Sequence, residues 1–144
     1  MNNETKLRIF LVDDDAVFLK ALEIDFRLQE SFIIETYATG ELCIENLIHK
    51  PDVIILDYQL DGTSKNAING LETLDAIVAF DKDITVVMLS SQDKIEVAVN
   101  CLHHRAFDYV VKSETAFMRL QMIINKISEY KKVEKKLNWY MTKM

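Results

Sequence analysis

Five short apolar runs recur along the chain, separated by stretches in which apolar residues return every three or four positions. The runs are RIFLV (8–12), FIIETYA (32–38), VIIL (53–56), TVVML (85–89) and YVV (109–111). Runs of this length and composition predict buried β-strands. VIIL contains no polar residue, which is typical of a strand buried on both faces of a sheet.

The stretches between the runs predict helices. Phe18, Leu22 and Phe26 recur at helical spacing, and Asp15 is a suitable N-cap for that helix. Later helices are indicated by Leu42, Leu47 and Ile48 after Gly40, by Leu71, Leu74, Ile77 and Val78, by Ile95, Val99 and Leu102, and by Phe117, Leu120, Ile124 and Ile127 from about Thr115. Alternating strands and helices imply right-handed crossovers and a parallel sheet covered on both faces. The predicted fold is α/β, a doubly wound five-stranded parallel sheet in the flavodoxin-like order 2-1-3-4-5.

Length and composition place few further limits on function. A chain of 144 residues with 49% hydrophobic content is expected to fold as one domain. Cys43 and Cys101 lie inside helical patterns and are expected to be buried free thiols. The three histidines, His49, His103 and His104, have no partners at zinc-ligand spacing and are expected on helix surfaces.

Charge is distributed unevenly. The net charge is −6, and residues 128–144 contain five lysines against two glutamates, which leaves −9 for residues 1–127. An acidic body argues against direct nucleic-acid binding by that part. The N-terminal MNNETK lacks the apolar core of a signal peptide, and no apolar stretch is long enough to cross a bilayer, so we expect a cytoplasmic protein without a membrane partner.

Polar residues directly follow the first, third, fourth and fifth apolar runs, which are neighbours in the predicted sheet. They are Asp13, Asp14 and Asp15 after the first run, Asp57 after the third, Ser90 and Ser91 after the fourth, and Lys112 after the fifth. These four strands are neighbours in the predicted order, so their side chains should converge in one crevice. Each residue alone has an ordinary explanation, as a helix cap, a turn or a surface charge, but clustered carboxylates repel one another unless a cation is present. An oxygen-only ligand set selects Mg²⁺ or Mn²⁺, and such a site suits phosphoryl transfer with Asp57 as the nucleophile.

The segments LVDDD, VIILDYQLDG, VVMLSS and AFDYVVK resemble, in order and spacing, those of receiver domains of bacterial two-component response regulators. The resemblance covers about residues 7–127 and implies a phosphorylation-dependent signalling switch, not an enzyme acting on other substrates. A sensor histidine kinase or histidine phosphotransfer protein would donate a phosphoryl group to Asp57, and the face formed by the fourth helix, fifth strand and fifth helix would change shape. The implied roles are Asp13, Asp14, Asp57 and the Gln59 carbonyl for Mg²⁺, Ser90 as switch hydroxyl, Tyr109 as switch aromatic and Lys112 as phosphoryl-binding lysine.

Three positions depart from the pattern of that family. Ser113 stands where proline usually follows the lysine, so the Lys112–Ser113 bond is predicted to be trans. The loop from Asp57 to Gly70 is longer than usual, with Asp61 where the family commonly has proline. Arg105 replaces a small residue, often glycine.

Two other functions fit parts of the pattern. A haloacid-dehalogenase-like phosphatase would use Asp13 as the nucleophile, in a loose Asp-x-Asp-x-Val motif with Asp15 and Val17. It would need a further acidic pair after a later strand, where the chain has hydroxyls instead. A flavodoxin-like cofactor binder shares the topology, but a flavin phosphate would lie poorly beside the aspartates.

The C-terminal residues 128–144 form a basic segment of their own, predicted as a helical extension of the receiver unit (1–127). Apolar residues alternate at three- and four-residue spacing, with only Glu134 breaking the series: Leu120, Ile123, Ile127, Tyr130, Leu137, Met141 and Met144. The series predicts that the last helix continues past the body. Such a helix would pair in a homodimer or lead into an effector domain beyond Met144, and a frayed solvated end is the alternative.

Overall fold

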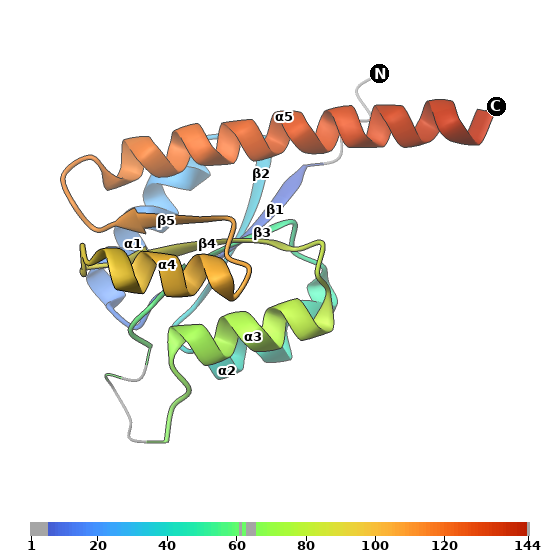
Figure 1. The fold of residues 1–144 in the computed structure, drawn as a ribbon. Helices are drawn as coiled ribbons and strands as arrows, with labels where there is room; N and C mark the ends of the chain where they lie inside the picture. The colour runs from blue at the N-terminus through green and yellow to red at the C-terminus, as the bar shows by residue number, and fades with distance from the viewer. Residues whose placement is uncertain (1–5, 61, 63–65, 144) are drawn as a thin grey trace.

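The structure is a computed structural model that describes residues 6–60, 62 and 66–143. Its strands are β1 (Leu7–Val12), β2 (Phe32–Tyr37), β3 (Val53–Asp57), β4 (Thr85–Ser90) and β5 (Asp108–Val111). Its helices are α1 (Ala16–Arg27), α2 (Gly40–Glu45), the 3₁₀ turn η1 (Leu47–His49), α3 (Gly70–Phe80), α4 (Ile95–His103) and α5 (Ala116–Lys143). Each strand lies where its apolar run predicts it (Figure 1).

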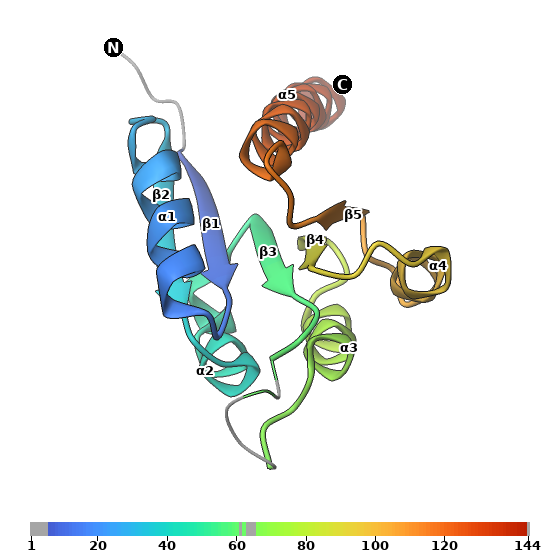
Figure 2. The same cartoon turned by 90° about the vertical axis from the view of Figure 1, so that its left-hand side faces the viewer.

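The five strands form one parallel sheet in the order β2-β1-β3-β4-β5, which confirms the predicted topology. Helices cover both of its faces (Figure 2). Ile9 and Leu11 point into the core shared with α1 and α5, whereas Phe10 and Val12 point into the core shared with α2, α3 and α4. All five residues of β3 are buried. The central strand therefore carries Asp57 to the carboxyl edge of the sheet.

The helix α4 was predicted in the right place from residues that do not face the core. Ile95, Val99 and Leu102 are 78%, 47% and 48% exposed, while Cys101 is fully buried against the sheet. Helical spacing alone cannot tell which side of a helix is covered, and α4 carries apolar residues on both sides. The same holds after β2, where Ile48 is 72% exposed.

The predictions about the two cysteines and about the Lys112–Ser113 bond are confirmed. Cys43 and Cys101 are buried free thiols. The Lys112–Ser113 bond is trans, since the described residues contain no cis peptide bond. No helix in the described part of the chain is long and apolar enough to cross a bilayer. Asp61 lies outside the described residues.

Arg105 lies two residues after the last residue of α4 and has φ 76°, in the left-handed region. Its N–H donates to the Leu102 carbonyl at 3.0 Å, and the Ala106 N–H donates to the Cys101 carbonyl at 3.0 Å. This pair of bonds is the Schellman motif, in which glycine is the favoured residue at the left-handed position. The left-handed backbone at this position therefore explains why receiver domains commonly have a small residue, often glycine, there.

Replacing Arg105 with glycine is expected to raise the free energy of unfolding by about 1 kcal/mol, because a side chain in the left-handed region costs about 1–2 kcal/mol and glycine's greater freedom in the unfolded chain offsets part of the gain. Urea unfolding would measure the change. Arg105→Ala is the matched control, since alanine keeps the backbone cost. Equal stabilisation by both substitutions would contradict this explanation.

Candidate functional site

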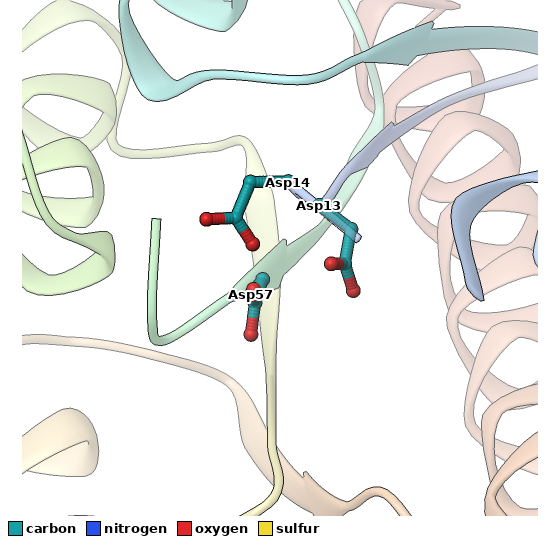
Figure 3. Close-up of side chains that lie close together, drawn as sticks. All are labelled: Asp13, Asp14 and Asp57. Atoms are coloured by element: carbon teal, nitrogen blue, oxygen red, sulfur yellow. The ribbon is translucent and has the colours of Figure 1, made fainter. Parts of the chain in front are cut away.

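Three aspartates meet at the carboxyl edge of the sheet. Asp13 and Asp14 follow β1, and Asp57 ends β3 (Figure 3). Asp13 and Asp57 are only 1% and 2% exposed, and Asp14 is half-buried. One carboxylate oxygen from each lies within 4.8 Å of the others. The sequence prediction that these carboxylates converge agrees with this geometry.

Backbone hydrogen bonds fix the turn that carries Asp13. Its N–H donates to the Tyr37 carbonyl at 3.1 Å, and its carboxylate accepts from the Asp15 N–H at 2.9 Å. Asp15 in turn caps α1, accepting from the Val17 and Phe18 N–H groups at 3.1 Å, as predicted. The Asp13 side chain is thus held by the same turn that begins α1.

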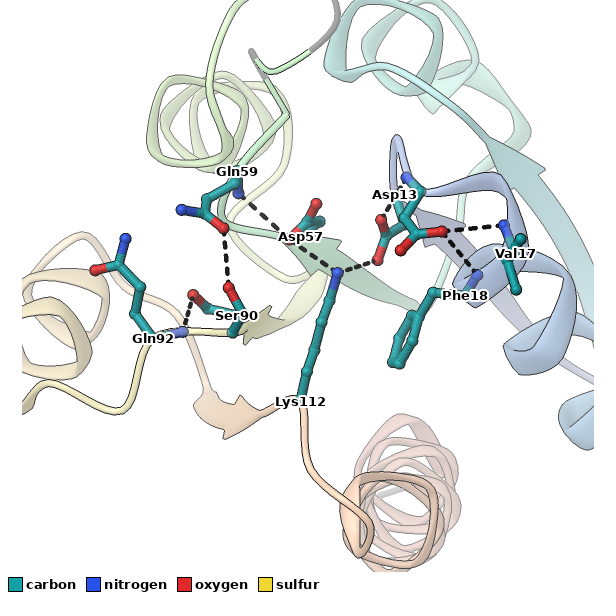
Figure 4. A network of polar contacts seen from close by, with 10 residues as sticks. Asp13, Val17, Phe18, Asp57, Gln59, Ser90, Gln92 and Lys112 are labelled. Atoms are coloured by element: carbon teal, nitrogen blue, oxygen red, sulfur yellow. Dashed lines mark hydrogen bonds and ion pairs between the residues drawn. The ribbon is translucent and has the colours of Figure 1, made fainter.

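Lys112 reaches the aspartates from the end of β5. Its Nζ lies 2.9 Å from Asp13 Oδ2 and 3.5 Å from Asp57 Oδ1 (Figure 4). The Lys112 backbone N–H also donates to the Ser90 carbonyl at 2.7 Å. Although the ammonium is close to Asp13 Oδ2, no donor among the described residues is aligned for a hydrogen bond to that buried oxygen. The ammonium of Lys112 therefore offsets the charge of Asp13 without giving Oδ2 a well-directed hydrogen bond.

Burial and crowding of charge perturb the titration of this cluster. Burial, reinforced by the negative charge of Asp13, raises the pKa of Asp57 to about 7. Burial alone would lower the pKa of Lys112, but its interactions with Asp13 and Asp57 hold that pKa above the ordinary lysine value. The site therefore contains more negative charge than one ammonium neutralises.

This donor set fits a hard divalent cation. All three candidate ligands are carboxylates, and one of their buried oxygens has no aligned hydrogen-bond donor in the part of the chain that the structure describes. Mg²⁺ and Mn²⁺ prefer such oxygen ligands, whereas zinc usually takes imidazole or thiolate. The repulsion between carboxylates, which adds to burial in raising the pKa of Asp57, would be relieved by such an ion.

Hydrogen bonds connect the predicted switch residues Ser90 and Tyr109 through Gln92, and connect Ser91 to Asp57 through Gln59. Ser90, fully buried at the end of β4, accepts a hydrogen bond from the Gln92 N–H at 3.0 Å. The Tyr109 hydroxyl donates to the Gln92 carbonyl. Ser91 donates to the Gln59 side chain at 3.1 Å, and the Gln59 N–H donates to Asp57 Oδ1 at 3.3 Å. The turn at Gln92 therefore links Ser90 to Tyr109.

One contributor to the site was not recognised in the sequence. The Phe18 ring lies under Lys112, with Nζ 4.6 Å from the ring centroid, and it also contacts the Phe117 ring, with 5.7 Å between centroids. Its spacing in the sequence predicts only an apolar position of α1. No signal in the sequence pairs it with Lys112, because the contact joins helix α1 to the far edge of the sheet.

Comparison with known proteins gives the same assignment over most of the chain. Residues 9–125 match the family model of the response regulator receiver domain. The protein-glutamate methylesterase/protein-glutamine glutaminase of Clostridium acetobutylicum is 33% identical over 118 residues, which cover 78% of this chain and 32% of that protein. The chain thus spans about a third of the length of this curated relative, whose named activities describe a much longer protein.

Solved structures agree in fold. A chain of the CheX–CheY–BeF3–Mg²⁺ complex from Borrelia burgdorferi aligns with a TM-score of 0.70 and 28% identity, covering 83% of this chain and 87% of that one. The receiver domain of NtrX from Brucella abortus aligns with a TM-score of 0.74 and 24% identity, covering 84% and 98%. These matches do not favour the phosphatase alternative with Asp13 as nucleophile. The chain belongs to the receiver domain family of two-component response regulators, whose members act as phosphoacceptor switches.

Proposed function

We propose that Asp57 is the phosphoacceptor of this switch, with a phosphohistidine on a sensor kinase or histidine phosphotransfer protein as donor. The observation that carries the proposal is the burial of Asp57 at the end of the central strand, with the Lys112 ammonium 3.5 Å away. A carboxylate oxygen of Asp57 attacks phosphorus, the phosphorus–nitrogen bond breaks, and the released imidazole takes up a proton. Lys112 then neutralises oxygens of the transferred group.

The metal belongs to the same proposal. Receiver domains bind Mg²⁺ in an acidic pocket, and Asp13, Asp14 and Asp57 are the acidic cluster of this chain. We assign these carboxylates and the backbone carbonyl of Gln59 as its ligands, and Mn²⁺ as a substitute with the same preference for oxygen. Bound Mg²⁺ supplies positive charge that offsets repulsion between the carboxylates and the incoming phosphoryl oxygens.

Ser90 and Tyr109 are assigned as the switch pair. The Ser90 hydroxyl accepts from Gln92, and a hydroxyl that accepts one bond still has its proton to donate to a phosphoryl oxygen. Such a bond pulls on the turn to which Tyr109 is tied through the Gln92 carbonyl. Converting about 1% active protein to 99% requires about 5.5 kcal/mol, and charge-assisted hydrogen bonds contribute about 1.5–3 kcal/mol each.

The output surface is the face formed by α4, β5 and α5. Its α4 side presents the exposed apolar residues Ile95, Val99 and Leu102. We assign residues 1–127 as the receiver unit and 128–144 as a helical extension, with a second copy or an effector domain beyond Met144 as the recipient of the signal. We place the switch in the cytoplasm together with its phosphodonor.

Acetyl phosphate with Mg²⁺ is expected to add one phosphoryl group to the wild-type protein and none to Asp57→Asn, because asparagine is not a nucleophile here. Intact-mass spectrometry would measure the addition. Asp83→Asn, which alters an exposed carboxylate, is the matched control and should be labelled like the wild type. Equal labelling of Asp57→Asn, or complete loss of labelling only in Asp13→Asn, would overturn the assignment of the acceptor.

Mg²⁺ is expected to raise the melting temperature, and Asp14→Ala is expected to remove this effect. A ligand that binds only the folded state adds about 2.7 kcal/mol at a hundredfold excess over its dissociation constant. Differential scanning fluorimetry with increasing Mg²⁺ would measure the shift, and Asp83→Asn again serves as control. A melting temperature of the wild type that does not respond to Mg²⁺ would argue against the metal site.

A further inference from the structure

The helix α5 extends well beyond the body of the protein. Its residues Ala116, Leu120, Ile124 and Ile127 are buried against the sheet, whereas every residue from 132 to 143 is exposed. Figure 1 shows the end of this helix projecting past the last strand. A projecting helix of this length needs either a polar surface all round or a partner.

The surface of the extension is amphipathic. Apolar side chains lie within an arc of about 100° at 100° per residue, and we call them the extension stripe: Tyr130 (70% exposed), Val133 (65%), Leu137 (57%), Tyr140 (55%) and Met141 (63%). The opposite side carries lysines and one tryptophan: Lys132, Lys135, Lys136, Lys143 and Trp139. The Tyr140 ring meets the ring of its neighbour Trp139, with 5.1 Å between centroids, and all five side chains of the stripe remain more than half exposed.

We propose that the extension stripe binds the same stripe of a second copy of this chain, with the two helices antiparallel. Positions 130, 134, 137 and 141 are separated alternately by four and three residues, which is the seam spacing of a two-helix coiled coil. Three of these seam positions belong to the stripe, and the fourth is Glu134. The proposal depends on the surface of α5 and not on the phosphoryl chemistry. Its orientation follows from the charges along the seam.

A parallel pairing would bring like charges together. Glu134 occupies a seam position, so in a parallel pair the two Glu134 side chains would face each other. Lys126 and Lys131 flank the seam at the positions that meet across a parallel pair, which adds a second repulsive contact. Like charges held in contact are unfavourable.

An antiparallel pairing removes both contacts. With Tyr130 opposite Met141 of the other copy, the next seam position places Glu134 opposite Leu137. In the same register Val133 lies beside Tyr140 on one side of the seam. On the other side Lys131 lies beside Asn138, which is neutral. Apolar residues of the two stripes then meet at Tyr130 and Met141 and at Val133 and Tyr140, and Leu137 is the one that faces Glu134.

Net charge favours the same orientation. Residues 1–127 carry −9 and the extension carries +3, from five lysines against two glutamates within a total of −6. Antiparallel helices place the two acidic bodies at opposite ends of a pair about 24 Å long, more than two Debye lengths apart at physiological salt. They also bring each basic extension toward the acidic body of the other copy.

Cysteine cross-linking tests the register. Under oxidising conditions, a mixture of the single variants Tyr130→Cys and Met141→Cys is expected to form the mixed disulfide dimer several-fold faster than either variant forms its own. Intact mass distinguishes the three products, and the native Cys43 and Cys101 are fully buried. Faster dimers within a single variant, or no reaction above the opposite-face control Lys132→Cys, would overturn the proposal.

Sedimentation equilibrium supplies a second, independent measurement. The interface is small compared with a standard one of about 800 Å² per partner, so a weak, concentration-dependent dimer is expected. Leu137→Asp should weaken it strongly, whereas Thr142→Asp, which adds the same charge at an exposed position on the side away from the stripe, should not. Equal effects of the two variants, or a wild type that stays monomeric at the highest concentration, would contradict pairing through the stripe. Either result leaves the labelling of Asp57 untouched.

Discussion

Replacing Lys112 with methionine is expected to slow labelling of the protein by acetyl phosphate about 100–1,000-fold. Removing one preorganised group that stabilises developing negative charge commonly costs this much in rate. The Lys112 ammonium lies 3.5 Å from the attacking carboxylate of Asp57 and is mostly shielded from water, with a side chain 18% exposed. Methionine keeps a long apolar side chain over Phe18 while removing the charge.

The rate would be followed by intact mass against time at saturating Mg²⁺. Lys82→Met removes an exposed lysine from the turn before β4 and is the matched control. Circular dichroism would verify that both variants are folded. If folded Lys112→Met were labelled within a few-fold of the wild-type rate, the lysine would have no part in stabilising the transferred group.

The Asp57→Asn variant is expected to be more stable than the wild type at pH 8 without divalent ions, by up to about 4 kcal/mol. Burial and the charge of Asp13 raise the pKa of Asp57 to about 7, against about 3.9 in an unfolded chain. Each pKa unit corresponds to 1.36 kcal/mol, and asparagine removes the charge that the folded state tolerates poorly. Urea unfolding in the presence of a chelator would measure the difference.

The pH dependence has a definite sign. Between about pH 4 and pH 7 the folded protein holds a proton on Asp57 that the unfolded chain has released, so this group makes stability fall as pH rises through that window. The advantage of Asp57→Asn over the wild type should therefore be small near pH 4 and full above pH 7. Asp83→Asn should show no such growing difference. A wild type that is as stable as Asp57→Asn at pH 8 would contradict an unfavourable carboxylate at this position.

The sheet and the acidic cluster could be predicted because both follow from local patterns. Each apolar run specified a strand, and parallel strands present their next residues at one edge, so Asp13 and Asp57 had to meet once the order was known. Asp15 was predicted as a cap because its side chain acts only on the next two or three residues. The roles proposed for Gln59, Ser90 and Tyr109 follow from the resemblance to receiver domains and not from these local patterns.

Features that depend on distant contacts could not be predicted. Whether Ile95 faces the core or the solvent depends on how α4 rotates against the sheet, and apolar residues on both sides of the helix hide that choice. The ring of Phe18 meets Lys112 only after two opposite segments of the chain pack together. The closer approach of Lys112 to Asp13 than to Asp57 is a balance of charges that spacing does not encode.

The unbroken course of α5 also gives it the mechanics of a lever. The helix begins four residues after Lys112 and continues for 28 residues, about 42 Å, without a proline or glycine to bend it. A tilt of about 5° about its first turn would move its far end by about 4 Å, most of a helical pitch. A small adjustment beside the phosphoryl site would thus be magnified along α5 into a displacement large enough to shift one helix against another.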